Sequence, residues 1–156
     1  MAIDPGKLTG CALLERERDD AAGLHVVRLL ESVETGPDET VPWCRRTFQE
    51  YGEPAEPGMP RMRVVIESFL ITQRTVAKSQ EASWALRTTG AVEQVCRDFG
   101  YPVDAIQFFS PDKKSAFPNP RLKKLGMWHV GGKGHALDGI RHGLIYLTQT
   151  GMLPSD

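Results

Sequence analysis

Short runs of alternating apolar and polar residues mark the N-terminal part of the chain. They predict β-strands over Met1–Asp4, Gly10–Glu15 and His25–Glu31. Turns are expected at Pro5-Gly6 and in the charged segment Glu17–Gly23, because these residue types favour reversal of the chain. The three strands therefore predict an antiparallel start to a sheet.

The rest of the chain alternates between helical and strand-like patterns. Apolar residues recur with a helical period over Thr40–Tyr51, Ala77–Phe99 and His135–Thr150. Between these helices, the runs Met62–Glu67 and Asp104–Phe109 predict two further strands. The order three strands, helix, strand, helix, strand, helix predicts an α/β fold in which helices flank a mixed sheet.

Two segments carry little periodicity and are expected to be connections. The first, Gly52–Pro60, is rich in Pro, Gly and Glu, and the second, Ser110–Lys133, is rich in Pro, Gly and Lys. In the long helix, apolar Ala85, Val92, Cys96 and Phe99 are predicted to share one face, with Gly100 ending the helix.

Length and composition indicate one globular domain over residues 1–156, with 40% hydrophobic residues. No apolar run approaches membrane-spanning length, and the N-terminus lacks a basic region followed by a hydrophobic stretch. We therefore expect a cytoplasmic protein without a membrane partner. Cys11, Cys44 and Cys96 are odd in number and widely spaced, which favours free thiols over disulfides or a zinc site.

The net charge of −1 hides an uneven distribution along the chain. Residues 1–68 hold 13 acidic and 8 basic side chains, whereas residues 69–156 hold 7 acidic and 11 basic ones. The basic excess is concentrated between Ser110 and His135, in a segment that could grip phosphates. A solvated lysine-rich loop explains the same pattern. The basic residues there are Lys113, Lys114, Arg121, Lys123, Lys124 and Lys133, against Asp112 alone.

Three carboxylates and one imidazole occupy positions that suit a divalent metal. Asp4 and Glu67 each end a predicted strand, so both acids are expected at an end of the sheet. His135 and Asp138 are three residues apart in the last helix and therefore share one of its faces. Oxygen ligands select Mg²⁺ or Mn²⁺, and two such ions roughly 4 Å apart would promote phosphodiester hydrolysis.

Each of these four residues also has a purely structural explanation. Asp4 begins a common Asp-Pro-Gly turn, and Glu67 could be a strand-end charge that reaches solvent. His135 could simply begin a helix, with Asp138 in its first turn favoured by the helix dipole. No separate explanation accounts for all four residues in this order in one small chain. The combined pattern therefore favours a metal site.

Several motifs together resemble the RuvC family of Holliday-junction resolvases, in particular the short phage-type members. Ile3-Asp4-Pro5-Gly6 with the following Thr9-Gly10 is similar to the opening signature of that family. Ile66-Glu67-Ser68-Phe69 is similar to its second acid and the aromatic residue after it. The other matching motifs are Gly90-Ala91-Val92, Ser110-Pro111 with Lys113 and Lys114, and His135-Ala136-Leu137-Asp138.

The chain departs from the family pattern in three places. Only three residues precede Asp4, and the segment Gln73–Ser83 is longer than its counterpart. The lysine register is shifted by about one, so either Lys113 or Lys114 occupies the position of the family's catalytic lysine.

The resemblance implies an RNase H-like fold, a homodimer and Mg²⁺-dependent endonuclease action on four-way DNA junctions. On this hypothesis Asp4, Glu67 and Asp138 bind two metal ions, with Mn²⁺ able to substitute. His135 would be a further metal ligand or would orient the attacking water, and Lys113 or Lys114 would stabilise charge on the phosphate. The DNA-contacting residues would be Phe69, Arg74, Lys78, Lys113, Lys114, Lys123, Lys124 and Lys133. Core packing also explains Phe69, and Arg74 and Lys78 fit solvated helix charges equally well. A phage-encoded member would be located in the host cytoplasm.

Two other functions fit the same residues. One is an RNase H-like nuclease that acts on RNA, RNA/DNA hybrids or forked DNA. The other is a catalytically silent DNA-binding or scaffold protein that keeps the fold. Retention of all four site residues argues against the silent protein.

Overall fold

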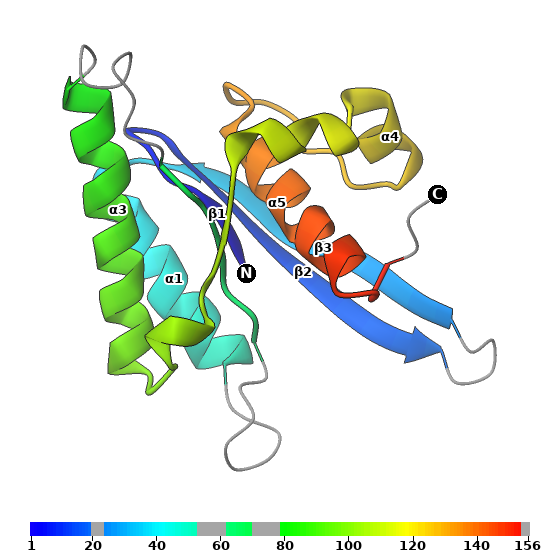
Figure 1. Ribbon diagram of the computed structural model, residues 1–156, viewed down its shortest axis with the longest axis horizontal. Helices are drawn as coiled ribbons and strands as arrows, with labels where there is room; N and C mark the ends of the chain where they lie inside the picture. The colour runs from blue at the N-terminus through cyan, green and yellow to red at the C-terminus, as the bar shows by residue number, and fades with distance from the viewer. Residues whose placement is uncertain (20–23, 53–61, 70–78, 154–156) are drawn as a thin grey trace.

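The computed structural model describes residues 1–19, 24–52, 62–69 and 79–153, which form a mixed five-stranded sheet flanked by helices (Figure 1). The strand order is β3-β2-β1-β4-β5. β1 pairs with β2, and β2 with β3, in antiparallel fashion, whereas β1, β4 and β5 run parallel. The strands are β1 (Ala2–Asp4), β2 (Thr9–Asp19), β3 (Leu24–Thr35), β4 (Val65–Glu67) and β5 (Gln107–Phe109).

Helices cover both faces of the sheet. Helices α1 (Pro37–Tyr51) and α3 (Ser79–Asp98) pack on one face, and α5 (His135–Gln149) packs on the other (Figure 1). Two short elements accompany α5: the 3₁₀ segment η2 (Pro111–Ala116) and helix α4 (Asn119–Lys124). A second 3₁₀ turn, η1 (Val103–Ala105), precedes β5.

Alternation along the strands creates a separate core on each face. On β1, Ile3 packs with the residues of α1 and α3, whereas Ala2 packs with those of α5. On β2, Cys11 and Ala12 divide in the same way. Because successive side chains of a strand point to opposite faces, one short strand contributes to both cores.

Helix α5 lies unusually close to β2 because small residues meet at the contact. A Cβ atom added to Gly10 would lie 1.8 Å from the carbonyl oxygen of His135, and one added to Gly139 would lie 3.0 Å from the Gly10 oxygen. The backbone of α5 therefore rests almost directly on the backbone of β2. This approach brings the first turn of α5 to the end of β1.

The predicted fold class and the antiparallel start are confirmed, with corrections to some boundaries. The strands β2 and β3 are longer than predicted and form one hairpin with an irregularity between Leu13 and Leu14. The predicted strand Asp104–Phe109 begins only at Gln107, because residues 103–105 form the turn η1.

Two further expectations from periodicity were wrong. The predicted connection Ser110–Lys133 contains η2 and α4, which are short and rich in lysine and so carry little apolar signal. Phe99 lies beyond the last residue of α3 and is 38% exposed, although its ring stacks on that of Phe48 at 5.2 Å. The part of the predicted helix before Ser79 and the loop residues 53–60 lie outside the described residues.

The three cysteines Cys11, Cys44 and Cys96 are free and buried. Within the described ranges, no helix has the length and apolar character needed to cross a membrane.

Candidate active site

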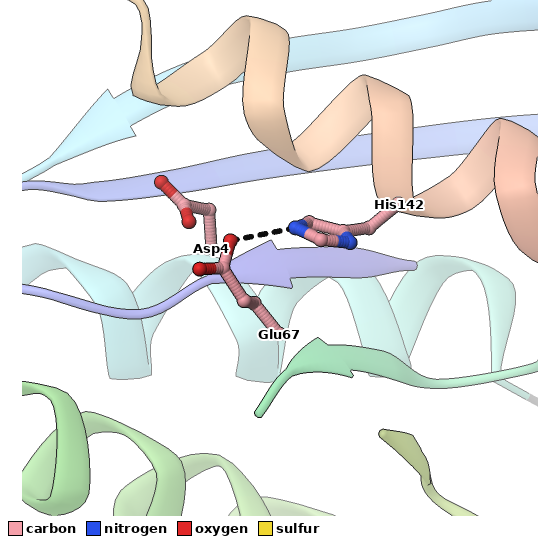
Figure 2. A group of neighbouring side chains, drawn as sticks. All are labelled: Asp4, Glu67 and His142. Atoms are coloured by element: carbon pink, nitrogen blue, oxygen red, sulfur yellow. Dashed lines mark hydrogen bonds and ion pairs between the residues drawn. The ribbon is translucent and has the colours of Figure 1, made fainter. Parts of the chain in front are cut away.

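Asp4 and Glu67 meet at one end of the sheet because their strands are parallel neighbours. Ile3 pairs with Ile66, so the next residue of each strand is a carboxylate at the same level. Alternation turns both carboxylates toward the α5 face, as Figure 2 shows. The Pro5-Gly6 turn then takes the chain away from the sheet, which leaves Asp4 at the strand end.

Helix α5 contributes the imidazoles to this end of the sheet. His135 Nδ1 lies 3.1 Å from Asp4 Oδ2. His142 Nε2 lies 2.6 Å from Glu67 Oε2, the contact drawn in Figure 2. His135, Asp138 and His142 follow the helical spacing that places them on one face. The face of α5 that carries them is therefore turned toward the two strand ends.

A single ammonium group joins the three carboxylates. Lys114 Nζ, from η2, lies 3.1 Å from Asp4 Oδ1, 2.5 Å from Glu67 Oε2 and 2.8 Å from Asp138 Oδ2. Lys113 points elsewhere, since its Nζ lies 5.2 Å from the centre of the Phe109 ring. Of the two lysines that the sequence left open, only Lys114 contacts the acids.

Burial and close charges change the pKa values of these groups in opposite directions. Burial, together with the adjacent Glu67 carboxylate, raises the pKa of Asp4 to about 8. Burial also acts against ionisation of Glu67, but hydrogen bonds with His142, Asp4 and Lys114 outweigh it and lower its pKa to about 2. The pKa of Lys114 is raised, because the charges of Asp4, Asp138 and Glu67 outweigh the effect of burial. At neutral pH one proton is therefore held on the Asp4–Glu67 pair, chiefly on Asp4.

Sequence reasoning missed two residues of this cluster. His142 is fully buried, and its Nδ1 has no hydrogen-bond partner among the described residues. Its place on the apolar face of α5 gave it the signature of a core residue. Arg141 contacts Asp138 Oδ1 and donates from Nε to the Phe117 carbonyl oxygen at 2.9 Å. Its position three residues after Asp138 was the available signal for this contact.

The predicted DNA-contacting residues are scattered around the site. Lys123 Nζ lies 4.5 Å from the centre of the Trp128 ring, and Lys124 and Lys133 are exposed. Phe69 follows the end of β4 and is partly buried. The remaining two, Arg74 and Lys78, lie outside the described residues.

The donor atoms at this end of the sheet fit a divalent cation. Asp4, Glu67 and His142 each offer one ligand atom, and these atoms lie within 4.8 Å of one another. Asp138 adds a third carboxylate through its shared contact with Lys114. A mainly carboxylate set with an imidazole suits Mg²⁺ or Mn²⁺ and does not resemble a thiolate zinc site.

The mixed five-stranded sheet with helices on both faces matches the RNase H-like fold of solved RuvC structures. No protein-family model and no curated protein sequence matches the chain. Two solved structures are similar to it, both at a TM-score of 0.59 and both over 97% of this chain and 95% of the other. One is Thermus thermophilus RuvC in complex with a Holliday junction substrate, at 20% identity, and the other is a Thermus thermophilus RuvC structure, at 18%. The predicted resemblance is therefore confirmed in the fold.

Proposed function

We propose that this protein is a metal-dependent endonuclease that hydrolyses phosphodiester bonds in branched DNA, foremost at four-way junctions. The observation that carries the proposal is the convergence of Asp4, Glu67 and Asp138 around one cationic position. Three acids placed together by two strand ends and a helix are costly without a cation to balance them. The RuvC-type fold supports DNA as the substrate.

The carboxylates of Asp4, Glu67 and Asp138 would hold two Mg²⁺ ions, with His135 as a further ligand or as the group that orients the attacking water. Bound divalent ions lower the pKa of water and offset the negative charge of the phosphate. The side chain of His135 is 40% exposed, so solvent and substrate can reach it. His142 is fully buried and holds Glu67 in place, which makes it a positioning residue in this proposal.

Lys114 is the lysine that we assign to the scissile phosphate. Its ammonium group already lies at the acids, within contact of all three carboxylates. An ammonium ion is suited to negative charge that builds on a phosphate during hydrolysis. Lys113, directed to the Phe109 ring, is left for contacts with the DNA backbone.

Basic residues beside α5 support binding of a polyanion. Segment 110–133, which carries most of them, packs on the same face of the sheet as α5 (Figure 1). Phosphate contacts from Lys123, Lys124 and Lys133 would position DNA without reading its sequence. We keep Phe69, Arg74 and Lys78 as further proposed DNA contacts. A homodimer is part of the proposal, because a two-fold pair of sites matches the two equivalent strands of a junction.

Cleavage of labelled substrates in Mg²⁺ tests this function. Wild-type protein, Asp138→Asn and the control Asp104→Asn, which alters an exposed carboxyl at the opposite end of β5, would be compared. The substrates are a four-way junction, a fork, a linear duplex and an RNA/DNA hybrid. Paired nicks in the junction that disappear only in Asp138→Asn are expected. Metal-dependent cleavage of the hybrid alone would assign the protein to RNA/DNA hydrolysis, and gel retardation without cleavage would leave a binding role.

A further inference from the structure

The first turn of α5 carries two of the proposed site residues but has no capping side chain of its own. The residue at the N-cap position is Gly134, with φ of +99°, and no side-chain hydrogen bond caps the helix from this position. Backbone N–H groups at the start of a helix have no partners within the helix. His135 and Asp138 therefore depend on some other group to fix the turn on which they lie.

Glu34, near the end of β3, supplies the missing acceptor from across the sheet. Its Oε2 accepts a hydrogen bond from the Lys133 amide at 2.7 Å, and its Oε1 accepts bonds from Gly134 at 2.6 Å and Ala136 at 3.4 Å. Hydrogen bonds from backbone N–H groups outweigh partial desolvation and lower the pKa of Glu34. The carboxylate is thus charged when it holds the amides, which strengthens each bond.

The loop before α5 is shaped to receive this carboxylate. Gly131, Gly132 and Gly134 all have positive φ, a conformation that other residues rarely adopt. A Cβ atom added to Gly132 would lie 2.4 Å from the Glu34 carboxylate. The glycine backbone of the loop therefore lies directly against the Glu34 carboxylate, and the amides of Lys133 and Gly134 point toward it.

The register of the sheet connects this contact to the metal site. Asp4 pairs with Gly10 across β1 and β2, and Gly10 pairs with Glu34 across β2 and β3. The three residues form one row under the first turn of α5, where the His135 backbone rests on Gly10. The row thus has a proposed metal ligand at one end, the helix contact in the middle and the carboxylate at the other end.

We propose that Glu34 is a positioning residue that locks the first turn of α5 onto the sheet, so that His135 and Asp138 face Asp4. The role rests on the proposed nuclease function, because it concerns the geometry of that site. Glu34 lies outside the proposed metal site, and its hydrogen-bond partners among the described residues are backbone amides of α5 and the preceding loop. Its effect on cleavage is therefore expected through the placement of other residues.

Two substitutions, Glu34→Ala and Glu34→Gln, test the proposal against the control Glu17→Gln. Glu17 is an exposed glutamate of the same hairpin that pairs with Arg28. Glu34→Ala should speed hydrogen exchange of the Gly134 and Ala136 amides about tenfold and lower kcat by about tenfold or more. Glu34→Gln keeps an acceptor oxygen, so its amide exchange and its kcat should lie between those of the wild type and Glu34→Ala. Junction affinity should stay within about twofold of wild type in every variant.

Amide exchange is measured without substrate, so it reports on the lock even if the protein cleaves no branched DNA. A failure of the nuclease proposal would then appear as an inactive wild type whose Gly134 and Ala136 amides still lose protection in Glu34→Ala. Unchanged exchange in Glu34→Ala would show that the Glu34 carboxylate does not hold the first turn of α5. Faster exchange with unchanged kcat would overturn the positioning role. If Glu34→Ala fails to fold, Glu34→Gln decides by the same two readouts.

Discussion

The two faces of the sheet are built from alternate residues of the same strands, yet they differ in the side chains that they present to the helices. Toward α1 and α3 the strands present Ile3, Cys11 and Ile66, which share one core with apolar side chains from both helices. Toward α5 they present small residues such as Ala2 and Ala12 and then, at the strand ends, the carboxylates. The first face holds its helices at side-chain distance, whereas the second lets a helix approach to backbone contact.

The difference separates the main stabilising core from the candidate site on opposite faces of one sheet. The carboxylates of Asp4, Glu67 and Asp138 form an acidic cluster. Among the described residues, the side chains in this cluster and those that contact it come from the strand ends, α5 and η2, and none comes from α1 or α3. Precise placement of α5 therefore matters for the site, while the opposite core mainly supports the sheet. Substitutions on the two faces are expected to have different consequences.

Glu67→Gln is expected to give the largest effect. The amide removes the negative charge that Lys114 and a divalent ion would share, and cleavage should fall roughly a thousandfold. The melting temperature should also fall, because the contacts with Lys114 and His142 that lower the pKa of Glu67 stabilise its ionised carboxylate in the folded protein, so cleavage is compared well below the unfolding temperature. Junction cleavage and thermal unfolding would be measured beside Glu93→Gln on α3. Retained cleavage in Glu67→Gln would remove Glu67 from the site.

Gly10→Ala is expected to disturb the α5 face most strongly among changes outside the acidic cluster. The new methyl group would lie 1.8 Å from the His135 carbonyl oxygen, so α5 must move away from the sheet. We expect a loss of cleavage of about a hundredfold together with lower stability, since catalysis is sensitive to displacements on the order of 1 Å. Gly90→Ala is the matched control, because a Cβ at Gly90 on α3 meets nothing within 4 Å. Equal behaviour of the two variants would contradict the close-contact explanation.

The acidic cluster should also make metal binding depend on pH. Burial raises the pKa of Asp4 to about 8, so below that pH a proton competes with the cation for this carboxylate. The affinity for Mg²⁺ should increase about tenfold per pH unit between roughly pH 6 and 7.5 and level off above pH 8. Calorimetry in buffers of different ionisation enthalpy would detect the released proton. In Asp4→Asn this dependence should disappear, and its persistence there would assign the proton to another group.

Val92→Ala on the opposite face should affect activity least. The Val92 side chain is fully buried between α3 and the sheet, so the truncation should lower the free energy of unfolding by about 2 kcal/mol. Cleavage per folded molecule should stay unchanged at a temperature well below unfolding. Ile140→Val in α5 removes less volume and should lower the free energy of unfolding by only about 1 kcal/mol. It should nevertheless reduce cleavage measurably, because Ile140 lies on the helix that carries the candidate site. A loss of activity in Val92→Ala at full folding would break the separation of the two faces.

Local patterns were sufficient to predict where the candidate site residues lie along the strands and the last helix. The β-branched run before Glu67 and the turn after Asp4 placed both acids at strand ends, and the spacing of His135 and Asp138 placed these two on one helical face. Parallel pairing of β1 and β4 then brings the two acids together. The fold class followed from the order of the elements.

The contacts that sequence reasoning did not find depend on register and packing between distant segments. Glu34 reaches α5 only because β3 pairs with β2 in one register, which no local pattern around Glu34 encodes. His142 lies at a position that helical periodicity assigns to the core, and it is buried. Its contact with Glu67 arises because the end of β4 lies beside it in the folded chain. The choice between Lys113 and Lys114 depends on the rotation of one 3₁₀ segment. Such differences arise from tertiary structure.

The position of Lys114 has a consequence for how the protein would exchange one cation for another. Its ammonium contacts the carboxylates of Asp4, Glu67 and Asp138 and offsets one negative charge among them, so a tethered counter-ion occupies the centre of the three acids. In the proposed function, binding of a divalent ion would then be an ion exchange, in which the ion must displace an internal competitor present at high effective concentration. The free energy of displacing it is subtracted from the metal's binding energy. The displaced ammonium of Lys114 would remain beside the divalent ion, where it could pair with the phosphate of a bound phosphodiester.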